Sequence, residues 1–415
     1  MTEPNLTHDI IISGGGMVGL SLALTCANQG LRVALIEKNL PPSPSLNDGQ
    51  YSPRVSAINH ASERFLNSIG AWQEIPTQRL CSYQKMHVWD GLGSAQLNFT
   101  AADVQTGHLG HIIENNHIVH ALWQCVYQQS LIDLYTSKQI ESLNNTAQNA
   151  SVNLESGECL TAALIVAAEG KFSPVRQFAG IQTNEWDYQH QAIVTTVKHQ
   201  LNHQNCAQQV FLESGPLAFL PLKTRDGANN VSSIVWSAKP ERAKQLLAMN
   251  DNDFKKALSQ AFEHSLGELE HIDARFSFPL TAQHAQSYFQ GRVVVVGDAA
   301  HTIHPLAGLG VNLGFLDAAT LGEELTRAKD KNIDLAHPHV LRRYQRQRKS
   351  HTYVVTGLME ALKRGFDQQG ASSVLVRNAG MQLINKSPIL KRPLILAALG
   401  DIGTALPKAC QPLTN

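Results

Sequence analysis

One acidic side chain, Asp298, stands between an apolar run at 293–296 and a glycine-rich stretch after which helical periodicity begins at Phe315. Three glycines of that stretch are closely spaced, at Gly308, Gly310 and Gly314. The pattern predicts a short buried strand, an acid, a glycine-rich turn and a helix. Glycine permits close approach of the backbone, and the N–H groups and dipole of a helix N-terminus favour negative charge. We expect the segment to hold a ligand between one carboxylate and a helix N-terminus.

The same segment must be weighed as a metal site, because His301 and His304 follow Asp298 at three-residue intervals. In a glycine-rich turn these side chains need not share a face, and the spacing alone fixes no coordination geometry. We therefore expect no metal here and interpret both histidines as packed, hydrogen-bonded pocket residues. A catalytic proton role for His304 is a weaker hypothesis.

A second glycine-rich turn lies near the N-terminus. Hydrophobic periodicity predicts a strand over 9–13, a helix over 20–29 and a second strand over 32–37 that ends at Glu37. The first strand is followed by glycines at G-x-G-x-x-G spacing, at Gly14, Gly16 and Gly19, with Met17 and Val18 completing the turn. In such units the helix N-terminus binds a pyrophosphate and the acid binds ribose hydroxyls. The unit predicts dinucleotide binding; the alternative is a plain glycine-rich turn.

The composition is that of an ordinary globular protein of two or more lobes. Charged residues make up 16 % of the 415 residues and the formal net charge is zero, so we expect no nucleic-acid partner. Six cysteines without a C-x-x-C pair favour reduced thiols in a cytoplasmic protein. We find neither a signal peptide nor a window of about 18 apolar residues that would span a membrane.

The remaining segments supply strands and helices around the two glycine-rich units. A loop is predicted over 40–52, sheet strands between 84 and 100 and between 192 and 237, and a helical region from 336 onward. Four arginines give that region a basic face, which we interpret as mostly solvated: Arg342, Arg343, Arg346 and Arg348. The apolar segment 389–399, interrupted by Lys391 and Arg392, is predicted to pack on the body or to lie on a membrane.

Together these motifs resemble the FAD-dependent aromatic hydroxylases of the para-hydroxybenzoate hydroxylase type. More narrowly, the chain is similar to the ubiquinone-biosynthesis hydroxylases, and most of all to the bacterial 2-octaprenylphenol hydroxylases. The resemblance covers nearly the whole chain. It is carried by Gly14–Gly19 with Glu37, Arg54–Asn59, His108–His111 with Glu114-Asn115, Trp186–His190, Ala218–Leu222 and Gly297–Gly314.

The resemblance implies an α/β fold in which a Rossmann-like FAD-binding domain is interleaved with a mixed β-sheet substrate domain, followed by a helical C-terminal region. The FAD-binding parts would be 1–80, 111–180 and 281–335. The substrate domain would comprise 81–110 and 181–280, and the C-terminal helical region 336–415.

It also implies roles for individual residues. The three glycines of the first turn would line the FAD pyrophosphate and Glu37 would bind the adenosine ribose, while Asp298 would bind the ribityl chain. The other expected cofactor contacts are Arg54 on a mobile loop, Asn115 near the ribityl side, Glu169, Pro305 over the reactive ring edge, Gly308, and the backbone N–H groups of Gly310, Val311 and Asn312. Two positions depart from the family: Glu169-Gly170 replaces Asp-Gly, and Leu309 replaces a glutamine.

The implied activity is that of a monooxygenase. NAD(P)H reduces FAD, O2 adds at the flavin C4a, and the hydroperoxide delivers one oxygen atom to a phenol ring. No acid–base pair is required, and the only catalytic candidates, both weak, are His304 and Arg54. Phe219, Leu220 and Pro221 would form an apolar wall for a polyprenylphenol, although the same residues also fit the interior of a sheet.

Other interpretations of function remain open at this stage. The protein is alternatively a hydroxylase of a small soluble phenol, or a non-catalytic flavoprotein scaffold, which only Glu169 and Leu309 would support. A polyprenyl substrate would bring peripheral contact with the inner face of the membrane and with other ubiquinone-biosynthesis proteins. The sequence leaves self-association undecided.

Overall fold

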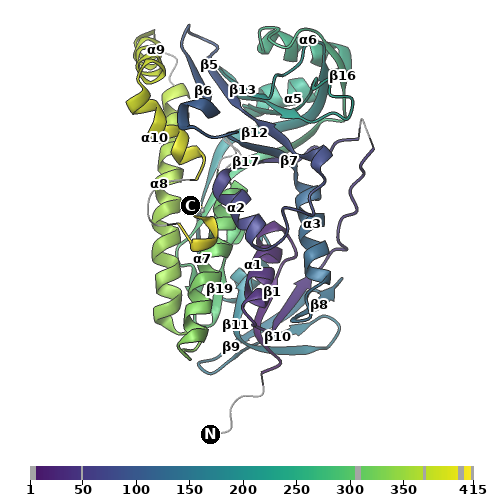
Figure 1. Cartoon of the computed structure of the whole chain (residues 1–415), viewed down its shortest axis with the longest axis vertical. Coiled ribbons are helices and arrows are strands. Elements are labelled where there is room, and N and C mark those ends of the chain that lie inside the picture. The colour runs from purple at the N-terminus through teal and green to yellow at the C-terminus, as the bar shows by residue number, and fades with distance from the viewer. Residues whose placement is uncertain (1–5, 48–49, 304–309, 368–370, 401–405, 413–415) are drawn as a thin grey trace.

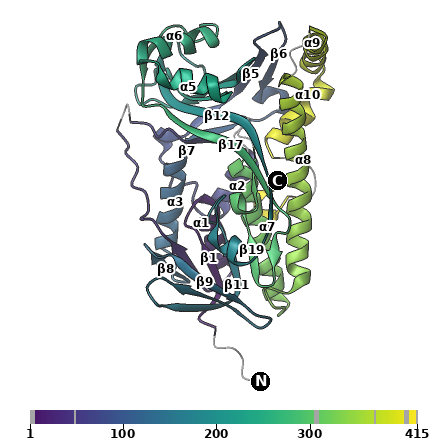
Figure 2. The same ribbon diagram turned by 180° about the vertical axis from the view of Figure 1, so that it is seen from behind.

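Two large β-sheets lie at opposite ends of the computed structural model, and long helices run alongside them (Figures 1 and 2). The structure describes residues 6–47, 50–303, 310–367, 371–400 and 406–412. A third, small sheet lies between the two large ones (Figure 1). This is the α/β architecture that the sequence predicted.

The first large sheet has a parallel centre in the order β19-β11-β1-β2-β8. Its parallel strands are β1 (His8–Ser13), β2 (Val33–Glu37), β8 (Ile132–Thr136), β11 (Cys159–Ala167) and β19 (Val293–Val295). The antiparallel strands β9 (Ile140–Asn145), β10 (Ala150–Leu154) and β18 (Phe289–Gln290) complete it. The middle of β1 consists of three consecutive isoleucines, all fully buried, because helices or strands cover both faces of a parallel sheet.

The chain leaves β1 toward β2 on one side and later returns to β11 on the other, so the strand order reverses between β1 and β11. At such a point the loops after the two strands diverge and leave a crevice at the carboxyl ends. The helices α1 (Met17–Asn28), α3 (Asn115–Tyr127) and α7 (Gly310–Asp330) pack around this sheet.

The second large sheet runs in the order β20-β17-β12-β15-β14-β13-β5-β6, with β16 beside β12. Its strands are β5 (Lys85–Asp90), β6 (Gln96–Thr100), β12 (Thr183–His199), β13 (Cys206–Leu212), β14 (Gly215–Leu222), β15 (Val231–Ala238), β16 (Leu269–Ile272), β17 (Phe276–Ala285) and β20 (His301–Thr302). The helices α5 (Pro240–Ala248) and α6 (Asp251–Ala261) cover one face, where they enclose an apolar core with Ile193, Phe219 and Trp236.

The predicted apolar wall of three consecutive residues on β14 does not form, because side chains alternate along a strand. Phe219 lies in the core under α5 and α6, stacked on Phe262 with ring centroids 3.7 Å apart. Pro221 is buried and, two residues after Phe219, faces the same side of the sheet. Leu220 belongs instead to the cluster on the opposite face, with Val55 and Ile112. Only Leu220 therefore remains on the side of the FAD-binding part.

The small sheet joins the two large ones. It has the order β3-β7-β4, with β3 (Val55–Ile58), β7 (Gly110–Glu114) and β4 (Cys81–Tyr83). Ile112 of β7 packs against Leu222 of β14, and α2 (His60–Ser68) follows β3 directly.

Three helices form the C-terminal region. α8 (Pro338–Asp367) packs along α7 and runs the length of the molecule (Figure 1). α9 (Ala371–Lys386) follows it and lies beside β6 of the second large sheet. α10 (Pro388–Ala398) leads back toward the small sheet. Ile395 and Leu399 pack there on Leu109, the residue before β7. Within the described ranges, no helix has both the length and the apolar character needed to cross a membrane.

Candidate functional site

Three of the sequence-predicted site segments meet at the carboxyl ends of adjacent parallel strands. Gly14 follows β1, Glu169 lies just beyond β11, and Asp298 lies just beyond β19. The N-terminal ends of α1 and α7 meet at the same place, because Val18 at the start of α1 packs directly on two glycines. A Cβ atom on Gly314 would lie 2.5 Å from the Val18 side chain, and one on Gly297 would lie 3.1 Å from it.

The glycines of the first turn divide into two kinds. Gly14 has φ +112°, and a Cβ on Gly19 would lie 1.9 Å from the Gly14 carbonyl oxygen, so the protein itself requires both glycines. A Cβ on Gly16 would meet nothing within 4 Å. Gly16 is also the N-cap of α1 and offers no side chain to the first N–H groups of the helix. Those groups face open space, which fits the FAD pyrophosphate.

Glu37 lies over the same turn from the end of β2. One carboxylate oxygen accepts from the Gly15 N–H at 2.6 Å and the other from the Asn39 N–H at 2.8 Å. A carboxylate has about four acceptor sites, so two remain after these bonds. They are placed for the hydroxyls of an adenosine ribose beside the pyrophosphate turn.

Asp298, Arg54 and Asn115 come from distant parts of the chain and gather on one side of the crevice. The carboxylate of Asp298 reaches solvent, yet burial raises its pKa, while the positive charges of His301 and Arg54 act to lower it. The Arg54 carbonyl accepts from the Asn115 N–H at 2.9 Å. The Asn115 side chain is fixed in turn by the Ser56 hydroxyl, 2.6 Å from its Oδ1. This arrangement suits a polyhydroxylated chain such as ribityl.

The first turn of α7 presents its N–H groups because its side chains point elsewhere. Asn312 is buried and donates through Nδ2 to the Ala57 carbonyl at 2.8 Å, while its Oδ1 accepts from the Asn59 N–H at 3.1 Å. A Cβ on Gly310 would meet nothing within 4 Å. The first N–H groups of a helix have no acceptor within the helix, so the start of α7 suits an anionic ring edge, as predicted for Gly310, Val311 and Asn312. Four predicted positions lie outside the described residues: His304, Pro305, Gly308 and Leu309.

The carboxylate of Glu169, a predicted cofactor contact, is held by groups of the protein. Its two carboxylate oxygens accept hydrogen bonds from the hydroxyls of Ser13 and Ser173 and from the Val175 N–H. Glu169 thereby joins the end of β1 to the N-terminus of α4 (Pro174–Phe178). Its partners are protein groups, so we interpret it as a residue that shapes the crevice and not as a direct ligand of the cofactor.

A buried ionic network that the sequence did not reveal lies behind Asp298. One Asp317 oxygen accepts from His301 Nε2 at 2.6 Å and from the Gly297 N–H at 2.9 Å, and the other accepts from Arg348 Nε at 2.7 Å. Burial acts to raise the pKa of Asp317, but the charges of His301 and Arg348 outweigh it and hold the pKa below its usual value. The network clamps both ends of the turn that carries Asp298.

A second buried pair fixes the 40–52 loop beside the same site. Arg79 lies 3.3 Å from Glu114, and its other guanidinium nitrogen donates to three loop carbonyls, those of Ser45, Asn47 and Gln50. Glu114 also accepts from the Ser52 N–H at 2.5 Å. Because Glu114 directly precedes Asn115, the pair ties this loop to the strand end that carries a predicted cofactor contact.

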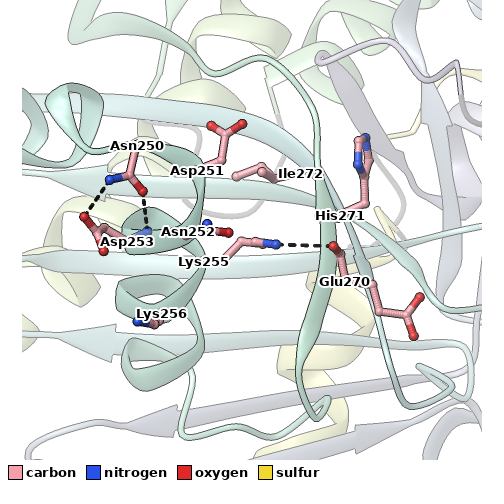
Figure 3. Close-up of a pocket in the computed structure, with 9 residues that line it drawn as sticks. All are labelled: Asn250, Asp251, Asn252, Asp253, Lys255, Lys256, Glu270, His271 and Ile272. Carbon is pink, nitrogen blue, oxygen red and sulfur yellow. Dashed lines mark hydrogen bonds between the residues drawn. The ribbon is translucent and has the colours of Figure 1, made fainter.

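The described chain also has a surface hollow away from this crevice, and we do not interpret it as the functional site. It lies between the start of α6 and β16 and is lined by polar groups (Figure 3). Asn250 caps α6 and bonds Asp253, and Lys255 donates to the Glu270 carbonyl at 3.3 Å. Four of the nine lining residues thus bond one another in pairs, Asn250 with Asp253 and Lys255 with Glu270.

The two kinds of glycine lead to a prediction. Gly16→Ala should change the unfolding free energy of the apoprotein by no more than about 1 kcal/mol, yet should weaken FAD binding strongly, because its methyl group would occupy the pyrophosphate space. Gly19→Ala should lower the unfolding free energy by about 3 kcal/mol, because its methyl group would collide with a backbone carbonyl. Chemical denaturation and flavin fluorescence titration measure the two quantities. Wild-type FAD affinity in Gly16→Ala would contradict the assignment.

Asp317→Asn should lower the unfolding free energy by about 3–5 kcal/mol, because it leaves buried charges without their partner. The folded pKa of Asp317 lies below its ordinary 3.8, so its stabilisation is present above pH 3.8 and is lost as the pH falls. The difference between wild type and variant should therefore narrow in acid. The control Asp251→Asn removes an exposed partner of Arg275 and should cost less than about 1 kcal/mol at any pH.

Comparisons with known proteins agree with this geometry. Residues 7–357 match the family model described as FAD binding domain. The 3-demethoxyubiquinol 3-hydroxylase of Escherichia coli K12 is 34 % identical over 95 % of this chain and 99 % of its own length. The human mitochondrial ubiquinone biosynthesis monooxygenase COQ6 is 31 % identical over 94 % of this chain and 92 % of its own length.

Among solved structures, the p-nitrophenol 4-monooxygenase PnpA of Pseudomonas putida DLL-E4 superposes with a TM-score of 0.77. It covers 96 % of this chain and 99 % of its own, at 20 % sequence identity, so the likeness concerns the fold. The glycine turns, the clamped Asp298 turn and the relatives that span the whole chain lead to one conclusion. The protein belongs to the family of FAD-dependent aromatic monooxygenases that includes the ubiquinone-biosynthesis hydroxylases.

Proposed function

We propose that the protein hydroxylates the aromatic ring of a polyprenylphenol intermediate in ubiquinone biosynthesis, with FAD as cofactor and NAD(P)H and O2 as co-substrates. The observation that carries the proposal is the extent of the similarity. Relatives named as ubiquinone hydroxylases match 94–95 % of the chain, including the second large sheet, and not the FAD-binding segments alone. The substrate-binding part therefore resembles theirs as well.

Bound FAD would supply the oxygen chemistry, since it accepts a hydride from NAD(P)H and passes electrons to O2. The protein's own groups bind and orient it. The α1 N-terminus would hold the pyrophosphate, Glu37 the ribose and Asp298 the ribityl chain. The N–H groups at the start of α7 would stabilise negative charge at the ring edge, where a fixed dipole adds no mobile charge. No described side chain is needed as a proton carrier.

The substrate ring would lie on the Leu220 face of the second sheet. Leu220 is half-buried and packs in a cluster with Val55 and Tyr51, next to Arg54. An apolar surface beside the cofactor's polar contacts suits a prenylated ring better than a charged soluble phenol. Glu169, which was one of two grounds for a non-catalytic scaffold, now has a structural role, and this weakens that alternative.

The C-terminal helices offer a surface for membrane contact. The inner side of α9 is polar: Arg377 pairs with Asp90 at 2.8 Å, and the side chains of Asn378 and Asn385 accept from N–H groups beside and on β6. Its outer side is apolar, with Val376 74 % exposed, and Ile389 at the start of α10 is 83 % exposed.

The charge of this region fits an anionic bilayer. Residues 371–400 contain no acidic residue. Of their four basic residues, Arg377 and Lys391 pair with Asp90 and Asp103, whereas Lys386 and Arg392 are exposed. Apolar side chains flanked by basic ones favour peripheral binding to anionic lipid. We propose that α9 and α10 bring the active site to the membrane that contains the prenylated substrate.

The reaction is tested by flavin absorbance during anaerobic NADPH addition, with and without a 2-polyprenylphenol analogue, followed by admission of oxygen. The analogue should accelerate bleaching at least about tenfold, a barrier change of ~1.4 kcal/mol, and a hydroxylated product should form. Leu220→Lys should raise the KM for the analogue and leave reduction without substrate unchanged. Peroxide alone, or preference for a small soluble phenol, would contradict the substrate assignment, and absence of bleaching with any phenol would favour the scaffold.

Membrane contact is tested by flotation with vesicles that contain anionic phospholipid. The wild-type protein should float with these vesicles and much less with neutral ones. The double variant Val376→Asp, Ile389→Asp should lose binding without loss of FAD, because it places charge in the apolar surface. The control Leu201→Asp alters an exposed leucine in the loop between β12 and β13 and should bind as wild type. Equal flotation of all three proteins would contradict the assigned surface.

A further inference from the structure

Three ligand-type side chains gather on the side of α2 that faces the approach to β7. Glu63 lies in α2, His108 lies two residues before β7, and His111 is the second residue of β7. One carboxylate oxygen of Glu63 lies 2.9 Å from His108 Nε2 and 3.4 Å from His111 Nδ1. The three ligand atoms all lie within 4.8 Å of one another. None of these residues is among the predicted cofactor or substrate contacts.

The local structure holds the three side chains in place. The His108 carbonyl accepts from the Thr106 hydroxyl and lies 2.9 Å from a ring nitrogen of His60, so the backbone of His108 is fixed from two sides. The ring of Trp72 meets the ring of His111 edge-on at 5.0 Å. The side chains are 20 %, 26 % and 12 % exposed for Glu63, His108 and His111. The cluster is thus shielded but still open to solvent on one side.

The chemistry of the cluster is incomplete without a further partner. His111 Nδ1 is buried and makes no hydrogen bond within the described chain, although it lies close to Glu63. Burial acts to raise the pKa of Glu63, but the hydrogen bond from His108 and the close approach of both imidazoles outweigh it and lower the pKa to about 2. A fully ionised carboxylate and two imidazoles therefore converge on a common point from separate elements.

Two imidazole nitrogens and one carboxylate oxygen are a ligand set that zinc takes in proteins, with a water at the fourth position. At zinc–ligand distances of about 2.1 Å, tetrahedral ligand atoms lie roughly 3.4 Å apart. The two distances from Glu63 to the imidazole nitrogens, 2.9 Å and 3.4 Å, are close to this value. We propose that Glu63, His108 and His111 bind one Zn²⁺ ion. The ion joins α2 to β7 and replaces the hydrogen bonds of Glu63.

The position of the site indicates a structural role. α2 begins after Asn59, whose N–H donates to Asn312 at the start of α7. β7 ends at Glu114, directly before Asn115, whose N–H donates to the Arg54 carbonyl. Leu109, between the two histidines, packs on Ile395 and Leu399 at the end of α10. Zinc would therefore hold together two elements that lead to the FAD site and the helix that closes the C-terminal region.

The test uses the FAD-loaded protein after chelator treatment and dialysis. After zinc is added back, mass spectrometry and competition with a chromophoric chelator should show one zinc ion per chain. The melting temperature should be higher with zinc than without it. Mg²⁺ should not bind, because it prefers oxygen ligands. Co²⁺ in place of zinc should give the intense visible absorption of a four-coordinate site. Glu63→Gln keeps the size of the side chain but removes its charge and should weaken zinc binding at least about tenfold.

Two further variants complete the design. His111→Ala should abolish stoichiometric binding and the cobalt spectrum, and retained flavin absorbance shows that it is folded. The matched control is His271→Ala, which removes a histidine that lies 3.1 Å from an aspartate but belongs to no group of three metal-type ligands among the described residues. The control should bind zinc as wild type. Absence of stoichiometric zinc in the wild type, or equal zinc binding in all variants, would overturn the proposal, and neither result bears on the hydroxylase activity.

Discussion

The carboxylate of Asp317 is the interaction on which the active-site arrangement depends. It is fully buried, and it accepts from a histidine and a backbone N–H of one turn and from an arginine of the distant helix α8. A buried carboxylate is tolerated only when such donors compensate its desolvation. Since the donors include Gly297 and His301, the turn between them, with Asp298 at its centre, has little freedom to move. Asp317 thereby positions Asp298, the predicted ligand contact.

Close packing of α1 against α7 is the second constraint. Where the two helices approach, Gly297 and Gly314 lie against Val18, and Gly322 lies against Thr25 with room for no Cβ atom. The two helix N-termini consequently open into one crevice, where both dipoles favour the negative groups of a bound dinucleotide. Glycine thus acts here through packing as much as through backbone conformation. The glycines that we expect to contact the cofactor, Gly16 and Gly310, are those at which an added Cβ would meet open space.

The C-terminal helices show why burial patterns must be interpreted with the structure in hand. α9 turns polar side chains inward because β6 is the edge strand of its sheet, and side-chain oxygens of Asn378 and Asn385 accept from N–H groups in the β5–β6 hairpin. Its apolar side chains then have no protein layer to enter, and the region carries uncompensated basic charge. The same helix seals a sheet edge and presents a surface suited to lipid.

The sequence by itself determined the local units. The strand–glycine–helix patterns at 9–29 and 293–325, the acid at Glu37 and the Asp298 turn follow from periodicity and from spacing within about 30 residues, which local physics controls. Tertiary structure decided how distant segments meet. In the sequence, Asp317 is an acid within an apolar helical segment and Arg348 is one of several arginines in another helical segment. Nothing in either segment indicates that they pair, because the contact depends on how the two helices pack. Phe219 and Leu220 were separated by strand alternation, and Glu169 was engaged by α4. Glu63 is 45 residues from His108, so only the pairing of β3 with β7 brings α2 beside that histidine. Contacts of this kind depend on which faces are buried together, and no spacing in the sequence encodes that choice.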